Sequence, residues 1–271
     1  MLDSELQRAV GYINEAGAIL ITAGAGIGVD SGLPDFRGNK GFWKAYPHFK
    51  DQNMSFVDAA SALMFETLPE LSWGFYGHRT NLYRETAPHM GFNLLKDIIK
   101  LKENNYFIFT SNVDGQFQKA GFDENRIIEC HGSIHHLQCT LPCISSSWKN
   151  ELSYKIDDNT GTLLSETPDC IFCGNTARPN ILMFDDNNWD SSRYYSQKSL
   201  YDKWLNENDN FVVIEIGAGN AIPTVRCESR KHKKPIIRIN LRDSKLSWAK
   251  GVSLEMTALE AIQKIYYNIS P

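Results

Sequence analysis

Near the start of the chain, apolar residues change from helical spacing to a continuous run. In residues 5–16 they recur every three or four positions, which predicts an amphipathic helix. Residues 18–22 read AILIT, a short run that predicts a strand buried on both faces. A glycine-rich turn at residues 24–28 follows directly. Helix, strand and glycine-rich turn in this order are typical of the start of a nucleotide-binding α/β sheet.

The same alternation of helical and strand-like segments returns later in the chain. Helical patterns occupy residues 92–102 and 257–267, and strand-like apolar runs occupy residues 106–110, 126–129, 211–216 and 235–240. Strands that alternate with helices predict a parallel sheet covered on both faces. In such sheets ligands bind outside the carboxyl ends of the strands, which is where the polar segments of this chain fall.

Two stretches interrupt this alternation. Residues 40–88 are rich in aromatic side chains with a helical pattern, and residues 137–178 carry four of the six cysteines with little periodicity. We interpret them as a helical insertion and a zinc-binding insertion. The main domain is then built from residues 1–39, 89–136 and 179–271. The expected fold class is α/β, a Rossmann-like parallel sheet with helices on both faces plus a small inserted zinc-binding and helical module.

The four cysteines of the second stretch form two close pairs, Cys139 with Cys143 and Cys170 with Cys173. Four thiolates at such short paired spacings suit tetrahedral zinc, and four protein ligands leave no position for a reacting water. The sequence therefore predicts a structural Zn²⁺ site. The alternative is four unrelated buried thiols.

Composition and charge narrow the function classes. The chain is 42% apolar and 22% charged, with a formal net charge of −4 and no long run of one sign. This balance is that of a soluble globular protein, and it gives no electrostatic footprint for nucleic acid or an anionic membrane. The N-terminal segment lacks the basic start and apolar core of a signal peptide. We therefore expect a cytoplasmic monomer that binds neither nucleic acid nor membrane.

The glycine-rich turn alone supports two interpretations. Glycines let backbone N–H groups approach a pyrophosphate closely. Val29, however, stands where the dinucleotide-binding fingerprint has its third glycine, and a tight turn without a ligand is the alternative. The continuation of the loop favours a ligand, because Arg37 can pair bidentately with phosphate and Phe36 can cover a reactive centre.

Three motifs together resemble those of one family. Residues 24–38, GAGIGVDSGLPDFRG, resemble the signature GAGxSxxSGIPDFRG of the sirtuins, the Sir2-like NAD-dependent protein deacylases. Residues 110–115, TSNVDG, resemble their TQNID-G run, and residues 130–132, CHG, resemble their catalytic HG. The four cysteines follow in the expected order, so the resemblance covers most of the chain.

The resemblance implies NAD as co-substrate and His131 as general base. This histidine would take a proton from the ribose after the acyl oxygen has attacked the anomeric carbon and nicotinamide has left. An imidazole has a suitable pKa for this role without any shift. Asn112 would order the nicotinamide ribose, and Asp114 would accept hydrogen bonds from the carboxamide. The alternatives are a histidine satisfied at a strand end and an ordinary Asn-x-Asp turn.

The resemblance also implies the full set of NAD-binding residues, namely Gly24, Ala25, Gly26, Ile27, Asp35, Phe36, Arg37, Ser111, Asn112, Asp114, Gly217, Ala218, Gly219 and Asn240. Three positions depart from the family pattern. Gly28 replaces a serine, Ser111 replaces a glutamine, and GAG at residues 217–219 stands where GTS is common. Each change removes a side-chain contact to the nucleotide that backbone N–H groups could replace.

Two further segments concern the acylated substrate. A helix expected over residues 73–84 carries Tyr76 and Arg79 on one face. This Tyr-x-x-Arg resembles that of the sirtuins that prefer succinyl- and malonyl-lysine, where the pair holds the acyl carboxylate. The alternative is an amphipathic helix whose Tyr and Arg meet solvent. Phe184 lies in MFDD, residues 183–186, which replaces the family's peptide-pairing FGE segment and puts peptide recognition in question.

Three functions remain open on the sequence alone. The first is an NAD-dependent deacylase of acylated-lysine proteins or peptides, a desuccinylase or demalonylase that could also act as a deacetylase, and it yields nicotinamide and O-acyl-ADP-ribose. The second is an ADP-ribosyltransferase or NAD hydrolase, which uses the same first half of the site. The third is a non-catalytic nucleotide-binding module, and the presence of His131, Asn112 and Asp114 argues against it.

Overall fold

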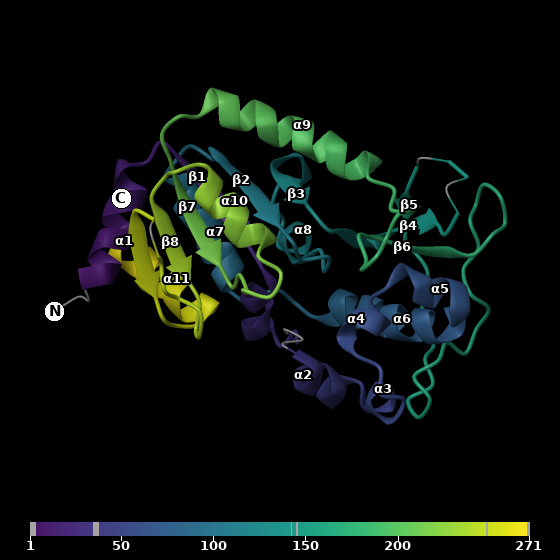
Figure 1. The fold of residues 1–271 in the computed structure, drawn as a ribbon. Helices are drawn as coiled ribbons and strands as arrows, with labels where there is room; N and C mark the ends of the chain where they lie inside the picture. Colours follow the sequence, from purple (N-terminus) through teal and green to yellow (C-terminus); the bar gives the residue numbers. More distant parts are fainter. Residues whose placement is uncertain (1–3, 35–37, 142, 145, 248, 270–271) are drawn as a thin grey trace.

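The computed structural model describes residues 4–34, 38–141, 143–144, 146–247 and 249–269, with only the backbone of residues 38–41. Its centre is a six-stranded sheet in the order β3-β2-β1-β7-β8-β9 (Figure 1). All neighbouring strands in this sheet run parallel. Their bounds are β1 (Ala18–Ala23), β2 (Tyr106–Thr110), β3 (Ile127–Glu129), β7 (Phe211–Ile216), β8 (Ile236–Ile239) and β9 (Gly251–Leu254). The predicted parallel α/β sheet is confirmed.

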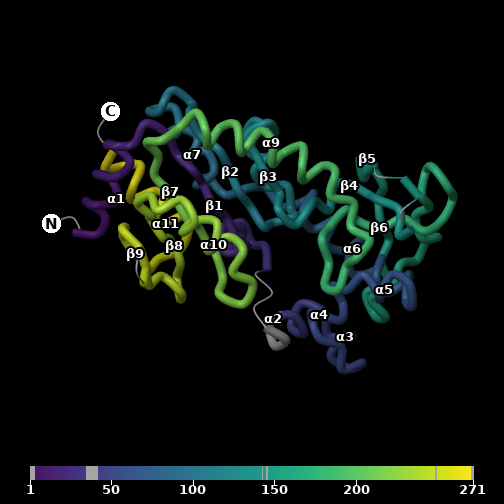
Figure 2. The backbone as a smooth tube through the Cα atoms, turned by 45° about the horizontal axis from the view of Figure 1, so that its top comes forward, coloured from purple at the N-terminus to yellow at the C-terminus, as the bar shows by residue number. Residues whose placement is uncertain are grey.

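Helices cover both faces of this sheet, as predicted. Successive strand residues point to opposite faces, so Ile19 packs in the core with α1, α7 and α11, whereas Leu20 packs in the core with α9 and α10. The bounds are α1 (Ser4–Glu15), α7 (Gly91–Lys100), α9 (Ser192–Glu207), α10 (Thr224–Lys231) and α11 (Ala258–Asn268). Figure 2 shows α9 extending from the large sheet toward the small sheet described below.

At β1 the order in which the chain adds strands to the sheet reverses. After β1 the chain adds β2 and β3 on one side, and only later adds β7, β8 and β9 on the other. At such a switch point the loops that leave the carboxyl ends of the strands diverge, and ligands bind in the crevice between them. The glycine-rich turn follows β1 here as a 3₁₀ turn, η1 (Ala25–Ser31).

A smaller antiparallel sheet, in the order β5-β4-β6, and several short helices form the other part of the molecule (Figure 1). Their shared core is largely aromatic, and Phe49, Trp73 and Phe75 are at most 1% exposed. The bounds are β4 (Gly132–Cys139), β5 (Trp148–Lys149), β6 (Ala177–Ile181), α2 (Gly38–Ala45), α3 (Pro47–Asp51), α4 (Phe56–Ala59), α5 (Ala62–Thr67) and α6 (Pro69–Glu85). The helical pattern of residues 40–88 is confirmed.

Several elements of the structure were not predicted from the sequence. They include α9, the short α8 (Gln116–Lys119) and the 3₁₀ turn η2 (Glu124–Arg126). The strands β4 and β6 run across the boundaries placed after residues 136 and 178, so the domain division itself stays a prediction. No helix in the described part of the chain is both long and apolar enough to span a bilayer.

Candidate active site

The glycine-rich turn packs directly on the loop that follows β7. The Gly26 N–H donates to the Gly217 carbonyl over 3.1 Å, and the Gly24 N–H donates to the Ile216 carbonyl over 2.9 Å. A Cβ atom added to Gly26 would lie 2.6 Å from the Gly217 Cα, and one on Gly24 would lie 2.9 Å from the Ala218 Cα. The two loops can meet only because these positions carry no side chain. The glycines therefore also serve the packing of the crevice itself.

Asn112 follows the neighbouring strand β2 and lies against the same turn. Its side-chain amide donates to the Gly24 carbonyl over 3.2 Å, and its backbone N–H donates to the Thr110 hydroxyl over 3.0 Å. The residue is 8% exposed. The turn after β1 and the loop after β2 are thus connected by a predicted site residue.

Asp114 lies two residues further along this loop and is partly buried. Its Oδ1 accepts a hydrogen bond from the Gln116 N–H over 2.9 Å. Burial raises the pKa of Asp114 to about 6, and the nearby Glu129 carboxylate raises it as well, whereas the Gln116 N–H and Arg79 oppose the rise. The backbone carbonyl of Asp114 also contacts His135 Nε2 at 2.9 Å, which fixes this loop on β4.

His131 lies at the third neighbouring strand end, between β3 and β4. The Cys130 N–H donates to the Thr110 carbonyl over 2.9 Å, and the His131 carbonyl accepts from the Leu182 N–H over 2.9 Å. Burial lowers the pKa of His131 below its usual value of 6.5. Packing at the strand ends removes water from the ring and so disfavours its charged form. The imidazole is neutral at pH 7 and can accept a proton.

Two side chains donate hydrogen bonds to one carbonyl of the loop after β7. Asn240 Nδ2 donates to the Ala218 carbonyl over 2.9 Å, and Arg226 donates to the same oxygen from Nε and Nη2 over 3.1 and 2.8 Å. Gly219 comes next and is partly exposed. Arg226 is 5% exposed and was not anticipated, because a lone arginine in a polar helix carries no sequence signal. Binding of NAD by Asn240 stays a prediction.

The other expected NAD-binding residues differ in how they are placed. Asp35, Phe36 and Arg37 lie outside the described residues. Ile27 is 1% exposed and packs in the core of the large sheet, so only its backbone can face a ligand. The Ser111 N–H donates to the Ala23 carbonyl over 3.1 Å and continues the ladder between β1 and β2. The alanine after Gly24 is exposed at the start of η1.

Tyr76 and Arg79 are both buried in α6, at 1% and 8% exposure. The Arg79 guanidinium lies 5.8 Å from the centre of the Tyr76 ring and donates from Nε and Nη2 to the Tyr83 hydroxyl over 3.0 and 2.6 Å. The alternative that the pair meets solvent is therefore wrong. The sequence analysis did not include Tyr83 in the site. It lies four residues after Arg79 and therefore on the same face of the helix, which could have indicated the contact. A role of the pair in binding an acyl group stays a prediction.

Phe184 is joined to the helical part of the molecule. Its N–H donates to the Ala60 carbonyl over 3.0 Å, and its carbonyl accepts from the Ala62 N–H over 3.3 Å. Alternate residues of a strand direct their backbone groups to opposite edges, so a peptide would pair with the neighbours of Phe184. One neighbour, Asp185, has a φ of +53° at the position where FGE has glycine. The next, Asp186, is buried in an ion pair.

The four predicted zinc ligands meet at one end of the small sheet. Their Sγ atoms all lie within 4.8 Å of one another, with 3.6 Å between Cys139 and Cys173 and 3.7 Å between Cys143 and Cys170. A zinc ion about 2.3 Å from four sulfurs requires sulfur–sulfur distances of about 3.8 Å. The side-chain amide of Asn175 donates to Cys173 Sγ over 3.2 Å, a contact that favours the thiolate. The cysteines fit a structural zinc ion.

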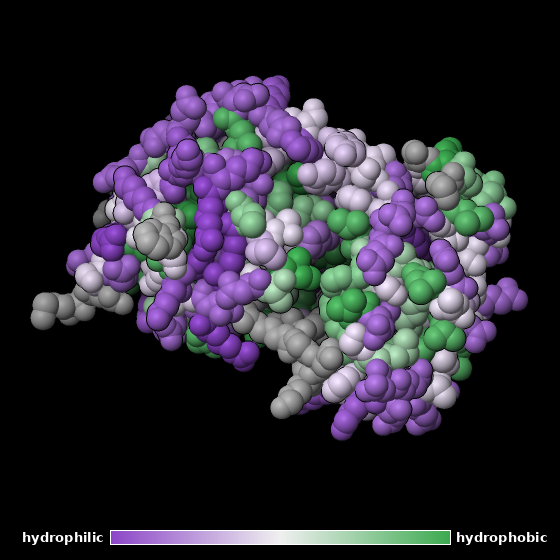
Figure 3. All heavy atoms as spheres, viewed as in Figure 1, coloured by the Kyte–Doolittle hydropathy of each residue, from purple (hydrophilic) through white to green (hydrophobic). Residues whose placement is uncertain are grey.

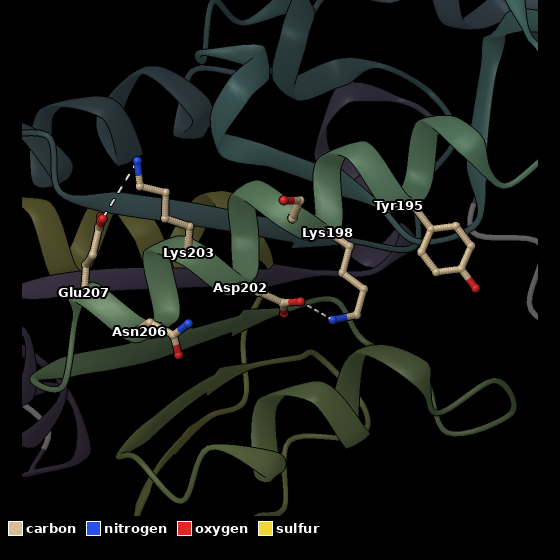
Figure 4. A pocket seen from close by; sticks show the side chains of 7 residues that line it. Tyr195, Lys198, Asp202, Lys203, Asn206 and Glu207 are labelled. Carbon is tan, nitrogen blue, oxygen red and sulfur yellow. Dashed lines mark hydrogen bonds and ion pairs between the residues drawn. The ribbon is translucent and has the colours of Figure 1, made fainter.

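The surface is hollowed between the part that holds the large sheet and the part that holds the short helices (Figure 3). A separate hollow of about 600 Å³ lies on the outer side of α9 (Figure 4). Lys198 and Asp202 form an ion pair there at 2.5 Å, and Lys203 lies 3.9 Å from Glu207. No described residue of the predicted site lines this hollow. It is the solvated charged side of a helix.

Comparison with known proteins identifies the family. A model of the Sir2 family matches residues 24–218. An NAD-dependent protein deacetylase of Saccharolobus solfataricus is 30% identical over 91% of this chain and 90% of that protein. An NAD-dependent protein deacylase of Aquifex aeolicus is 31% identical over 62% of this chain, and the chain spans only 62% of that protein's length.

The solved structure of a Sir2 homologue in complex with NAD has the same fold. It superposes with a TM-score of 0.74 at 21% identity, over 99% of this chain and 94% of that chain. The family match includes the glycine-rich turn, the loop after β2, His131 and all four cysteines. Since this match covers well over half of the sequence, the chain belongs to the Sir2 family.

Proposed function

We propose that this chain is an NAD-dependent protein-lysine deacylase, which converts NAD and an acylated lysine into nicotinamide, free lysine and O-acyl-ADP-ribose. The observation that carries the proposal is the meeting of three adjacent strand ends. The glycine-rich turn follows β1, Asn112 and Asp114 follow β2, and a neutral His131 follows β3. Relatives in Saccharolobus and Aquifex bear the names of a deacetylase and a deacylase.

The chemistry of the donor and acceptor groups at this crevice fits NAD. Asp114, with its pKa near 6, is mainly ionised at pH 7.5, so it can accept hydrogen bonds from a carboxamide NH₂. The close approach of Gly26 to Gly217 keeps side chains out of the space above the strand ends, where a pyrophosphate would lie. NAD, when bound, supplies the electrophilic anomeric carbon of its nicotinamide ribose.

His131 then acts as a general base. After nicotinamide has left, its neutral ring accepts the proton of a ribose hydroxyl, and the hydroxyl oxygen can attack the acyl carbon. Burial keeps the ring unprotonated at pH 7. Asn112 holds the ribose in place, because its own amide is already fixed on the Gly24 carbonyl.

The test is an NAD-dependent assay on acetyl-, succinyl-, malonyl- and long-chain acyl-lysine peptides, with product identified by mass spectrometry. We expect peptide deacylation in the wild type and a loss of roughly 10²–10⁴-fold in the His131→Ala variant, the range of general-base catalysis. His48→Gln serves as the control, since this histidine lies in the helical part of the molecule. Equal rates for wild type and His131→Ala would contradict the proposal.

The two other functions give different results in the same assay. An NAD hydrolase or ADP-ribosyltransferase would consume NAD without O-acyl-ADP-ribose, because the ribose would pass to water or to another acceptor. A non-catalytic module would bind NAD and turn over none. Either result would replace the deacylase proposal.

We further propose that the preferred acyl groups are succinyl and malonyl. Arg79 is buried among the rings of Phe75, Tyr76 and Tyr83, whose centres lie 5.2, 5.8 and 5.4 Å from its guanidinium carbon. Burial raises the pKa of Tyr76 to about 12, so its hydroxyl stays protonated and can donate. A carboxylate would gain charge-assisted hydrogen bonds in these apolar surroundings, whereas an acetyl group offers no charge.

This preference is tested by the Arg79→Met variant, with the acetyl peptide as internal reference. The ratio of kcat/KM for succinyl over acetyl peptide should fall by about 10- to 100-fold, equivalent to a charged hydrogen bond of about 1.5–3 kcal/mol. Deacetylation should persist. Equal rates of the wild type on both acyl classes would show that the pocket is wrongly assigned, without affecting the deacylase proposal.

A further inference from the structure

A buried carboxylate lies two residues before His131 and takes no direct part in the proton transfer described above. Glu129 is the last residue of β3, and its side chain is 1% exposed. Its Oε2 lies 2.5 Å from Nη1 of Arg193 and accepts from Nε2 of Gln197 over 3.3 Å. The Glu129 N–H donates to Oε1 of Gln197 over 2.9 Å. Backbone and side chain of the strand end are thus both bound to α9.

Stability alone gives a poor account of this contact. Removing a carboxylate from water costs several kcal/mol, and a buried ion pair is often no more stable than apolar residues of the same volume. Arg193 also lies in the first turn of α9, where the helix dipole favours anions over cations. What the three side chains do provide is a fixed geometry between α9 and the end of β3.

The other flank of His131 is fixed by the strand that precedes α9. The Leu182 N–H donates to the His131 carbonyl over 2.9 Å, and Gly132 pairs with Ile181 of β6. A Cβ atom on Gly132 would lie 2.0 Å from the Asn180 carbonyl oxygen, so the two backbones are in direct contact. The backbone at His131 therefore lies between the contact with β6 on one side and the contact of Glu129 with α9 on the other.

We propose that Arg193 and Gln197 are positioning residues, which hold Glu129 and so keep the His131 ring where it can accept the ribose proton. The inference rests on the proposed deacylase function. Neither residue touches the reacting atoms. We expect their effect to fall on the step that needs His131.

The experiment compares two rates in the Arg193→Met variant. Exchange of labelled nicotinamide into NAD, with acyl peptide present, reports the bond between nicotinamide and the anomeric carbon, which breaks before His131 acts. Formation of O-acyl-ADP-ribose requires the proton transfer to His131. We expect product formation to fall by roughly 10- to 100-fold, the cost of a small misplacement of a catalytic group. Exchange should stay within about twofold or rise, because the later step no longer drains the reaction.

Two further variants keep the test decisive. Arg193→Lys should recover most of the product rate, since it restores a cation beside Glu129. Lys198→Met removes an ion pair from the same helix, between Lys198 and Asp202, and should leave both rates unchanged. Should Arg193→Met misfold, Gln197→Leu provides the same comparison of rates. NMR signals of the His131 ring, measured without NAD, should shift in the Arg193→Met and Gln197→Leu variants and not in Lys198→Met.

The results of these experiments distinguish a positioning role from a purely structural one. A parallel loss of exchange and product formation, with lowered thermal stability, would mean a purely structural role and overturn the inference. An unchanged product rate would overturn it as well. Absence of both activities in the wild type would instead refute the proposed function.

Discussion

The same physical cause moves the pKa values of two proposed site residues in opposite directions. Burial disfavours the charged form of each group, so it lowers the pKa of His131 below 6.5 and raises that of Asp114 to about 6. At pH 7.5 the first is therefore a neutral base and the second is mainly an anionic acceptor. This division of roles fits a site in which only the imidazole takes up a proton.

The pH dependence of turnover follows from these two shifts. His131 must be unprotonated and Asp114 ionised, so activity is present above both pKa values and is lost as the pH falls through them. The acidic limb of kcat/KM should lie between about pH 6 and 6.5, since Asp114 titrates near 6 and His131 below 6.5. A pH–rate profile with acyl peptide and NAD measures this limb. An acidic limb centred at pH 7 or above would contradict the assignment.

Among the helices and strands, the sequence predicted those with a clear pattern of apolar residues within the segment itself. The strands β1, β2 and β7 are apolar at nearly every position because both faces are covered, and their predicted ends agree within one residue. The helix α9 was missed because its buried residues include Gln197, Tyr201 and Trp204, which form no apolar stripe. The side-chain partners of site residues depend on distant segments, so no local pattern predicted Arg226 or the contact of α9 with β3.

The contact between the turn after β1 and the loop after β7 yields a prediction for Gly26→Ala. The added Cβ would lie 2.6 Å from the Gly217 Cα, so the backbone must shift, at a cost of about 1–3 kcal/mol. We expect a lower melting temperature and weaker NAD binding by calorimetry. Gly11→Ala is the matched control, because nothing lies within 4 Å of a Cβ at this position in α1 and alanine favours a helix by about 0.5–1 kcal/mol. A Gly26→Ala protein as stable as the wild type would contradict this packing account.

At the scale of the whole molecule, the small sheet connects the cysteine cluster to the active site. The strand β4 begins beside His131 and ends at Cys139, while β6 returns from the cluster to pair with Gly132. A zinc ion that holds the far end of this sheet would therefore also stabilise the near end. The cysteine spacing predicted the cluster. The pairing of β4 with β6, which connects the cluster to the backbone beside His131, was found only in the structure.

Removal of the metal should accordingly reduce both stability and activity. We expect about one zinc ion per chain by elemental analysis, and loss of the ion with a lowered melting temperature in Cys170→Ser. Cys227→Ser should keep the metal, because Cys227 is exposed and lies outside the cluster. Chelation should lower deacylation in the wild type. A Cys170→Ser protein with full zinc content would show that these thiols do not form the site.

In the proposed reaction the ribose of NAD receives the acyl group, and His131 accepts the proton of the ribose hydroxyl. The most direct test is the ratio of O-acyl-ADP-ribose formed to peptide deacylated, measured in one reaction at pH 7.5. We expect the two products to form in equal amounts and both to nearly disappear in His131→Ala. Consumption of NAD to ADP-ribose with the acyl peptide intact would contradict it.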